Sequence, residues 1–563
     1  MKRFVALSAF VCALWSSTTL RADVELKHRW VWCMHNLATD ANVDFLSTLM
    51  ERAKKCGYTG FVLSDYKFNV LDRMDRHYFN NVERLKAKAR ELGLDLIPTC
   101  IGIGYSEGIL VHDPNLAEGF PVVDAPFVVK GGKLVPVSDG GAVVNGDFEE
   151  AKGVAPAGWY PEELPPYATL VDDVAHDGKK SLRFADVPKG ATAWITQKVA
   201  TKPVRAWRLS VWIRTENLVN PDGVVLTAMG RRPATLSHQY LEVKRTQDWT
   251  EHHVAFNTLE NGDVRVTLDV AGGGGKLWVD NLRMEPLGFV NVLRRDACPV
   301  KLASSDGKTV YVEGRDVAPV VDPKLGREKW SGTFAAWHTP PEIAIPAGSR
   351  LKEGDRVLAG YFHPMITLGS QLTVSLTDPK VYAIIDDQIT RTNDLFHPKF
   401  FFMGYDEIRT GGWTPDYADQ TCGEALAKSV KKSYDIIKKH APEAEVLVWN
   451  DMFDPNHNAQ SKKPYYLVKG GWAGSWEGLP KDVIVMDWLS GTAQKSFDFF
   501  NGRGNARQMM AGYYDGDPDK SAKTWVDAAK ASKAKIIGIM YTTWAANYKD
   551  LEAFIEAAEK YAK

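Results

Sequence analysis

The sequence predicts an eight-stranded parallel α/β barrel that is interrupted by a large all-β domain. Two regions, residues 27–102 and residues from 378 to the end, alternate apolar runs with amphipathic helical segments. The residues between them form short runs of alternating apolar and polar side chains, broken by Gly, Pro and Asn. Such alternation is typical of a β-sandwich or jelly roll. The two outer regions together hold eight strands, the number that closes a TIM barrel.

Three barrel strands precede the interruption and five follow it. The central part of each run is continuously apolar rather than alternating, as expected for strands that are buried on both faces. In the first predicted helix, Phe45, Leu49 and Ala53 recur at helical spacing and Gly57 ends it. Asp378 and Pro379 are typical of a helix start. The predicted strands are 28–34, 58–65, 94–102, 400–405, 445–450, 483–488, 508–514 and 535–544.

These elements predict four parts of the chain. Residues 1–22 form a signal peptide, residues 23–112 the first part of the barrel, and residues 371–563 its second part. The inserted β region covers residues 113–370, with a jelly roll at about 143–288. The domain is therefore inserted after the third barrel strand.

The first residues predict export. Lys2 and Arg3 form a basic start, residues 4–15 are apolar, and Leu20-Arg21-Ala22 provides a cleavage site. The apolar run is too short for a membrane span. We therefore expect an exported protein, periplasmic or extracellular. The five remaining cysteines are scattered without metal-type spacing, and an odd number argues against a disulfide framework. We expect them to be free, buried thiols.

The composition excludes several function classes. The formal net charge is −1 over 563 residues, so the sequence has no basic field for nucleic acid or anionic lipid. The 13 His residues form no HxH or HExxH pattern at a strand end, which disfavours a metal-dependent hydrolase. The chain has 18 Trp, 20 Tyr and 23 Phe, and such rings stack on sugars or fill cores. The sequence does not indicate an oligomeric state.

Carboxylates and aromatic rings gather where the predicted strands end, and the chemistry of a TIM barrel lies at the C-terminal ends of its strands. Carboxylates can protonate a leaving group and stabilise positive charge, while rings enclose a sugar. Each residue alone could instead be a helix cap or a packing ring. The joint pattern predicts a carbohydrate site. Its members are Asp65, Asp406, Glu407, Trp449, Asp451, Asp487, Trp488, Tyr513, Tyr514, Asp515 and Trp544.

Asp406 and Glu407 are adjacent, which is unusual for a pair of catalytic acids. Successive residues of a strand point to opposite faces, so both can face one pocket only where the strand has already become a loop. Glycosidases with two carboxylate catalysts take them from different elements. An adjacent pair therefore indicates that one acid protonates the glycosidic oxygen while its neighbour holds part of the substrate.

The motif "MGYDE" at 403–407 resembles the Gly-x-Asp-Glu of the family 20 glycoside hydrolases, the β-N-acetylhexosaminidases. The resemblance implies catalysis assisted by the substrate's own acetamide group, without a cofactor. It implies that Glu407 is the general acid and then the base, and that Asp406 orients the acetamide nitrogen. By the same resemblance Tyr513 binds the acetamide oxygen and Asp515 a sugar hydroxyl. The tryptophans that enclose the acetamide are then Trp449, Trp488 and Trp544.

The sequence departs from that family at three strand ends. His35 and Asn36 stand where the family has an arginine that grips sugar hydroxyls. "IGIGYSEG" replaces a Pro-Gly-His, and "WAA" after the eighth strand lacks a glutamate. These changes put the identity of the sugar in doubt, and His35 becomes a candidate for binding it.

The insert has a resemblance of its own. The pattern "NGDFE…VDNLRM" over residues 145–284 resembles a carbohydrate-binding jelly roll. The resemblance implies a structural calcium ion held by Glu149 and Asp280, with Asp147 and Asp177 near them. The alternative is a sandwich that binds no ligand and shapes the rim of the site, and the sequence favours it slightly.

Three functions stay open at this stage. The first is an exported glycosidase, exo-acting on β-linked N-acetylhexosamine. The second is a retaining glycosidase of another specificity, with Glu407 as the acid and Asp487 or Asp515 as the nucleophile. The third is a barrel that binds carbohydrate without cleaving it. All three expect a glycan or glycoconjugate as the partner.

Overall fold

The computed structural model describes residues 24–563 apart from positions 232, 238, 327–331, 370 and 464. The predicted signal peptide lies outside the described residues, so export stays a prediction. In the part of the chain that is described, no helix is long and apolar enough to cross a membrane.

Eight parallel strands close into a barrel, as the sequence predicts. The order around the barrel follows the chain, and β1 pairs with both β2 and β26 to complete the circle. The strands before and after the interruption meet where β3 pairs with β20, with Met403 opposite Cys100. The strands are β1 (His28–Met34), β2 (Gly60–Ser64), β3 (Asp95–Cys100), β20 (Phe400–Met403), β22 (Glu445–Trp449), β24 (Ile484–Asp487), β25 (Arg507–Tyr513) and β26 (Lys535–Thr542).

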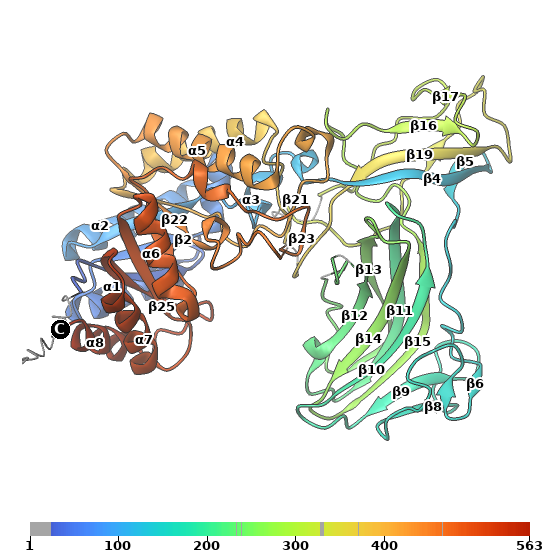
Figure 1. The fold of residues 1–563 in the computed structure, drawn as a ribbon, viewed down its shortest axis with the longest axis horizontal. Helices are drawn as coiled ribbons and strands as arrows, with labels where there is room; N and C mark the ends of the chain where they lie inside the picture. Colours follow the sequence, from blue (N-terminus) through green and yellow to red (C-terminus); the bar gives the residue numbers. More distant parts are fainter. Residues whose placement is uncertain (1–23, 232, 238, 327–331, 370, 464) are drawn as a thin grey trace, which may run out of the picture.

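Helices surround this barrel (Figure 1). The Asp75 side chain caps α2 by accepting from the Tyr78 amide, and Gly93 ends it at a φ of 61°. Asp378 caps α4, as predicted from the Asp-Pro pair. The α-helices of the barrel layer are α1 (Asp40–Lys55), α2 (Arg76–Leu92), α4 (Pro379–Phe396), α5 (Cys422–His440), α6 (Ala493–Arg503), α7 (Pro518–Ala531) and α8 (Leu551–Ala562); the short α3 is Glu107–Leu110.

The barrel strands are buried on both faces, which explains their continuous apolar runs. Along β20 the side chains of Phe400 and Phe402 join the cluster inside the barrel, while Phe401 and Met403 join the cluster beneath the helices. Each fully buried side chain of this size contributes about 1.5–3 kcal/mol to the hydrophobic stabilisation. A polar substitution at any of these positions would therefore disturb one of the two layers.

Two antiparallel sheets form a β-sandwich in the chain between β3 and β20. The apolar side chains of both sheets, such as Leu209, Leu226 and Leu268, pack into one core. The sandwich lies to the side of the barrel, lower right in Figure 1. One sheet has the order β13 (Gln247–Asn257), β11 (Ala206–Glu216), β15 (Lys276–Pro286), β9 (Ser181–Ala185), β8 (Ala168–Val171), and the other the order β10 (Thr192–Ala200), β14 (Asp263–Ala271), β12 (Val224–Met229).

A third antiparallel sheet connects the sandwich to the barrel. Its long strands β4 and β19 pair over most of their length, so the chain leaves and returns along the same path. This sheet bears out the predicted β character of the tract near 290–365, while the predicted domain boundaries stay predictions. Its order is β17 (Val310–Tyr311), β16 (Lys301–Ser304), β19 (Arg356–His363), β4 (Phe120–Lys130), β5 (Lys133–Pro136), β18 (Ile343–Ala344).

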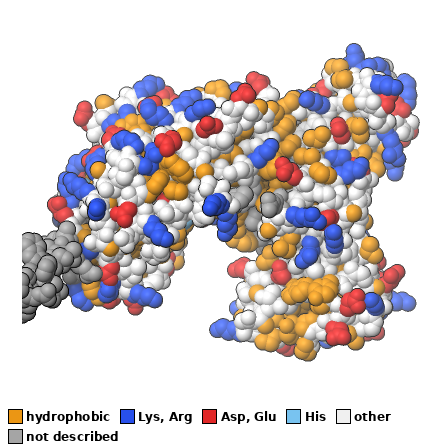
Figure 2. All heavy atoms as spheres, in the orientation of Figure 1, with side chains coloured by type: hydrophobic (Ala, Val, Ile, Leu, Met, Phe, Trp, Pro, Cys, Tyr) orange, Lys and Arg blue, Asp and Glu red, His pale blue; other side chains and the backbone are white. Residues whose placement is uncertain are grey.

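The surface and the thiols agree with the composition. Figure 2 shows Lys and Arg interspersed with Asp and Glu over the face in view, without a field of one sign.

The five cysteines Cys33, Cys56, Cys100, Cys298 and Cys422 are free, as predicted. Cys56 and Cys100 are only partly buried.

Candidate active site

A cavity of about 790 Å³ opens at the C-terminal ends of the barrel strands. This is where the sequence predicts the site. Segments that follow β1, β2, β3, β20, β24, β25 and β26 contribute to its lining, as does the end of β22. Of the predicted site residues, those that line it are His35, Asp65, Asp406, Glu407, Trp449, Trp488, Tyr514 and Trp544.

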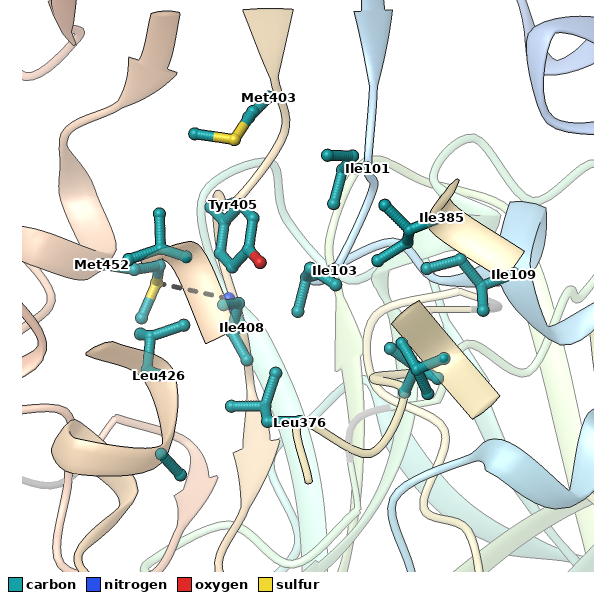
Figure 3. Packing of buried hydrophobic residues seen from close by; sticks show 14 of the residues in the cluster. Ile101, Ile103, Ile109, Leu376, Ile385, Met403, Tyr405, Ile408, Leu426 and Met452 are labelled. Carbon is teal, nitrogen blue, oxygen red and sulfur yellow. Dashed lines mark hydrogen bonds between the residues drawn. The ribbon is translucent and has the colours of Figure 1, made fainter. Parts of the chain in front are cut away.

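Asp406 and Glu407 both face this cavity because the strand has ended before them. β20 stops at Met403, and Glu407 has a φ of 50°, which turns the backbone out of the extended form. The side chains on either side of the pair, Tyr405 and Ile408, point into the core outside the barrel (Figure 3). The sequence-based expectation about the adjacent acids therefore agrees with the structure.

The core fixes this turn on its apolar side. The Tyr405 hydroxyl lies 2.9 Å from the Ser429 hydroxyl and 2.8 Å from that of Ser433, both on α5. The Ile408 amide donates to the Met452 sulfur at 3.3 Å, the dashed line in Figure 3. The turn is therefore held by α5 and by the loop after β22, and the two acids have little freedom to move.

The cavity side of the same turn is also held closely. A Cβ atom at Gly104 would lie 1.9 Å from the Asp406 carbonyl oxygen, so only glycine allows the loop after β3 to approach. The Gln371 amide donates to the Glu407 carbonyl at 3.0 Å. The Glu407 amide donates to the Asp451 carboxylate at 2.9 Å. Such support is what precise placement of a reactive pair requires.

The Glu407 carboxylate has two side-chain partners, of which Tyr105 lines the cavity. Arg409 forms an ion pair with one oxygen at 2.7 Å, and the Tyr105 hydroxyl donates to the other. Arg409 itself is buried, and its guanidinium lies 5.0 Å from the centre of the Tyr466 ring. Glu407 is therefore placed by one residue from the loop after β3 and one from its own loop.

Asp406 lies among other acids, and its pKa is raised to about 8. Burial is the largest cause, followed by the charges of Asp451 and Glu407, while Arg409 partly opposes them. Burial also raises the pKa of Asp451 to about 6, although the Glu407 amide and Asn458 stabilise its charged form. This group of carboxyls therefore retains a proton at neutral pH.

Aromatic rings form the walls around these acids. Trp449, Trp488 and Trp544 line the cavity as predicted, and Trp32 lies between two of them. The centre of the Trp32 ring lies 5.5 Å from that of Trp449 and 5.3 Å from that of Trp544. Trp488 stacks on Tyr514 at 6.2 Å, with 21° between the planes. Such walls suit the apolar faces of a sugar ring.

Tyr513 does not face the cavity, contrary to the prediction. Its hydroxyl donates to Asp550 at 2.8 Å, and its ring stacks on Tyr541 at 4.2 Å outside the barrel. Tyr514 lines the cavity instead. The cause is a turn in which Tyr513, Tyr514 and Asp515 have φ values of 75°, 49° and 58°. Three left-handed residues in a row are costly, and such strain is often found at functional sites.

Three predicted acids do not line the cavity, and two of them, Asp451 and Asp515, support it from outside. Asp451 is fully buried and holds the Glu407 amide. Asp515 accepts hydrogen bonds from the Thr543 hydroxyl at 2.6 Å and the Trp544 amide at 3.1 Å, and so fixes the loop that carries Trp544. Asp487 is 1% exposed, and neither carboxylate oxygen has a hydrogen-bond partner among the described residues.

Asp65 and His35 line the opposite part of the cavity. Asp65 accepts from the Leu37 amide at 2.9 Å, the Lys67 amide at 3.1 Å and the Tyr78 hydroxyl at 3.1 Å. It therefore joins the loops after β1 and β2. His35 Nε2 lies 3.2 Å from the Tyr548 hydroxyl, and burial lowers the pKa of its imidazole.

The sequence interpretation missed Trp32, Tyr105 and Arg409. Trp32 shares the inward face of β1 with Trp30, a spacing of two that "RWVWC" shows. Arg409 follows Glu407 by two residues, and a positive charge so close to the two acids could have indicated an ion pair with one of them. Tyr105 lies in a loop whose shape the sequence does not reveal. The remaining lining residues include Asn36, Tyr66, Lys67, Asn69 and Glu107.

The proposed calcium ligands of the sandwich are occupied by backbone amides. Glu149 accepts from the amides of Lys179 and Lys180 at 2.6 and 2.7 Å. One oxygen of Asp280 accepts from the His176 amide at 2.8 Å, and the other from the Asn281 amide at 2.7 Å. Among the described residues no group of three or more His, Cys, Asp or Glu could hold a metal ion. In this structure Glu149 and Asp280 bind backbone amides, and a calcium ion held by them stays a prediction.

Comparison with known proteins gives only distant similarities. No protein-family model and no curated protein matches the chain. A rhamnosidase from Novosphingobium sp. PP1Y has a TM-score of 0.34 and 12% identity, over 96% of this chain and 59% of its own. The Flavobacterium johnsoniae chitobiase has a TM-score of 0.21 and 14% identity, over 34% of this chain and 33% of its own.

The module TmCBM61, solved with β-1,4-galactotriose, has a TM-score of 0.21 and 18% identity, over 26% of this chain and 97% of its own. All three proteins are named for sugar cleavage or for a bound sugar. At these TM-scores the similarities carry no argument about the present chain, whose function must be argued from its own site.

Proposed function

We propose that the protein is a glycoside hydrolase whose reaction is carried out by the adjacent acids Asp406 and Glu407. The observation that carries this proposal is that both acids face one cavity enclosed by four tryptophans. Tryptophan walls bind sugar rings and exclude water, and paired carboxyls supply the proton and the charge stabilisation that glycoside cleavage needs.

The charge of the site favours a cationic transition state. The carboxyls of Asp406, Glu407 and Asp451 lie close enough to affect one another's charge, and the guanidinium of Arg409 pairs with Glu407. Burial and the charges of Asp451 and Glu407 raise the pKa of Asp406, so a further negative charge there is disfavoured. A positive charge that develops on the sugar would relieve this repulsion, and stabilisation of that kind lowers the barrier.

We further propose that the substrate is a β-linked N-acetylhexosamine at the end of a glycan. Neither nucleophile suggested by the sequence, Asp487 or Asp515, lines the cavity. A reaction in which the substrate's own acetamide oxygen attacks the anomeric carbon needs no separate nucleophile. In this scheme Glu407 protonates the glycosidic oxygen and later activates water, while Asp406 holds the acetamide nitrogen. Tyr514, which lines the cavity, then binds the acetamide oxygen in place of Tyr513, to which the family resemblance gave that role.

A second candidate is a retaining glycosidase with a nucleophile on another element. The specific observation in its favour is Glu107, at the start of α3, which also lines the cavity. Asp65 is less suited to this role because three hydrogen bonds already occupy its oxygens. The two candidates differ in whether a covalent sugar–enzyme bond forms.

Substrate specificity tests the first candidate against the second. Purified protein is assayed on 4-nitrophenyl β-glycosides with and without a 2-acetamido group. The proposal expects cleavage of the acetamido sugars alone, and at least about 1,000-fold lower kcat in Glu407→Gln. Glu443→Gln makes the same chemical change at an exposed position before β22 and is expected to retain full activity. Cleavage of plain sugars, with a sugar trapped on Glu107, would establish the second candidate.

The leaving group distinguishes the roles of the two acids. A variant that lacks its proton donor should recover most of its rate on 2,4-dinitrophenyl glycosides, whose leaving group needs no protonation. We expect this recovery in Glu407→Gln and not in Asp406→Asn. If only Asp406→Asn recovered its rate on the 2,4-dinitrophenyl substrate, Asp406 would be the proton donor and Glu407 the residue that holds the acetamide. No turnover of any substrate by the unmodified protein would leave a barrel that only binds carbohydrate.

A further inference from the structure

A second cavity, of about 560 Å³, lies on the β-sandwich, far along the chain from the barrel site. Two exposed aromatic rings belong to its apolar part. Tyr160 is 58% exposed and Trp194 37% exposed, and their ring centres lie 5.5 Å apart with 37° between the planes. Large exposed rings that lie next to each other are unusual on a soluble protein and often mark a binding site.

The position of Trp194 in its strand explains its exposure. Along β10, Ala193 and Ile195 point into the sandwich core, so Trp194 lies on the outer face of the sheet β10–β14–β12. Neither ring therefore belongs to the core of the domain. Replacement of either should leave the sandwich folded.

The segment that carries Tyr160 is held firmly against β10. The Tyr160 amide donates to the Thr196 carbonyl at 2.9 Å, and the Thr196 amide donates back at 2.8 Å. The Gln197 side chain donates to the Gly158 carbonyl at 2.9 Å. The Trp159 indole donates to the Asn145 carbonyl at 3.0 Å. The two rings are therefore fixed before any ligand arrives, which lowers the entropy cost of binding.

The polar part of this cavity is mostly cationic. Lys152, Lys198 and Arg265 line it together with one acid, Glu162. Lys152 pairs with Glu162 at 3.1 Å, and Lys198 pairs with Asp263 at 3.3 Å. Arg265 lies opposite Lys198 in the paired strands β10 and β14, and it has no ion-pair partner among the residues described here. Its guanidinium can therefore bind an anionic group, to which its planar fork is suited.

We propose that this cavity binds an anionic saccharide, with a pyranose ring against Tyr160 and Trp194 and its carboxylate or sulfate on Arg265. Rings of this size supply the apolar contact and the cations supply selectivity for charge. The site is separate from the barrel cavity and goes beyond the proposed function. It would hold the protein on an acidic polysaccharide whether or not the barrel cleaves that polymer.

Binding is measured on the full-length mature protein by isothermal titration calorimetry. The probes are polygalacturonate as the carboxylate polymer, dextran sulfate as the sulfate polymer, and dextran as the neutral one. We expect at least one anionic polymer to bind at least about 10-fold more tightly than dextran, with affinity falling as salt rises. Which polymer binds distinguishes a carboxylate from a sulfate ligand.

Variants assign the binding to this cavity. Trp194→Ala and Tyr160→Ala should each weaken it at least about 10-fold. Arg265→Gln should remove the preference for the anionic polymer. Tyr240→Ala changes an exposed tyrosine elsewhere on the same domain and should have no effect. Failure of both anionic polymers to bind, equal binding of dextran, or unchanged binding in Trp194→Ala would each overturn the proposal. Glu407→Gln should bind the anionic polymer as tightly as the unmodified protein does. A failure of the catalytic proposal would therefore leave this binding result unchanged.

Discussion

The backbone amide of Glu407 donates a 2.9 Å hydrogen bond to the side chain of Asp451, which lies just beyond the end of the neighbouring barrel strand β22. This contact joins the position of one acid to the charge of another. Because Asp451 also raises the pKa of Asp406, one buried carboxylate acts on both members of the pair. The site is therefore a group of three acids rather than a pair.

Asp451→Asn should shift the pH dependence of kcat/KM. Asparagine can still accept the Glu407 amide, so the geometry is kept while the charge is lost. Without that charge the pKa of Asp406 falls below its value of about 8, although burial keeps it above that of an exposed aspartate.

In the proposed scheme Asp406 accepts a hydrogen bond from the acetamide nitrogen, so it acts in its charged form and the reaction gains rate as pH rises through this pKa. The acidic limb of kcat/KM should therefore move to lower pH in Asp451→Asn, as a pH–rate profile on the 4-nitrophenyl substrate would show. An acidic limb at the same pH as in the unmodified protein would contradict the arrangement of charges described here.

Tyr105→Phe should lower kcat about 10-fold with little change in KM, because it removes one of the two groups that place the Glu407 carboxylate. Tyr66→Phe is the matched control. Tyr66 lines the same cavity, but its hydroxyl has no hydrogen-bond partner within the described part of the chain. Steady-state kinetics of both variants make the comparison, and equal losses in the two would show that Tyr105 has no particular role.

Two cavity tryptophans should respond differently to replacement. Trp544 is 48% exposed, so Trp544→Ala should raise KM and leave the melting temperature nearly unchanged. Trp449 is 3% exposed and packs on Trp32 and Phe402, so Trp449→Ala should cost about 3–5 kcal/mol of stability as well as activity. Melting curves recorded beside the kinetics would separate these effects. A stable Trp449→Ala would mean that the barrel interior is less tightly packed than described.

Asp487→Asn should stabilise the protein, and by more at pH 8 than at pH 5. Burial raises the pKa of this carboxyl well above its ordinary value, so the folded state keeps a proton that the unfolded state loses. For such a group stability falls as pH rises above the pKa of the unfolded state.

Asparagine cannot ionise, so Asp487→Asn should be less pH-sensitive than the unmodified protein. We expect a gain of more than about 1 kcal/mol near pH 8, because one unit of pKa difference between the folded and unfolded states corresponds to about 1.4 kcal/mol. Thermal melts at the two pH values measure it, with activity as the control, because Asp487 lies outside the cavity. A loss of stability at both pH values would indicate that the carboxylate has a partner in solution.

The barrel was predictable because strands that are buried on both faces appear in the sequence as continuous apolar runs. The runs ending at Met403 and Trp449 are apolar throughout, and their ends locate Asp406, Glu407 and Trp449 without further information. The adjacent acids could be placed together because a strand that has ended no longer alternates its side chains.

The errors arose where the backbone leaves regular geometry. A strand pattern puts Tyr513 in the site, but its φ of 75° turns it outward and Tyr514 inward. Nothing in the letters "YYD" reveals that turn, because non-glycine residues rarely adopt such angles. Tyr105 was not predicted for a related reason. Its loop reaches Glu407 only because Gly104 allows a close approach to the Asp406 backbone. Asp487 and Asp515 do not line the cavity, and Asp515 belongs to the same left-handed turn as Tyr513.

The pairing of β4 with β19 bears on how the chain folds. The barrel needs Cys100 of β3 and Met403 of β20 to meet, although most of the chain's other β-strands lie between them. Closing so long a segment of unfolded chain costs entropy and slows folding. Once β4 and β19 have paired, the two barrel strands are connected by a short path and the effective separation becomes small. The inserted region should therefore fold before the barrel closes, and hydrogen exchange during refolding should protect the amides of β4 and β19 earlier than those of β20.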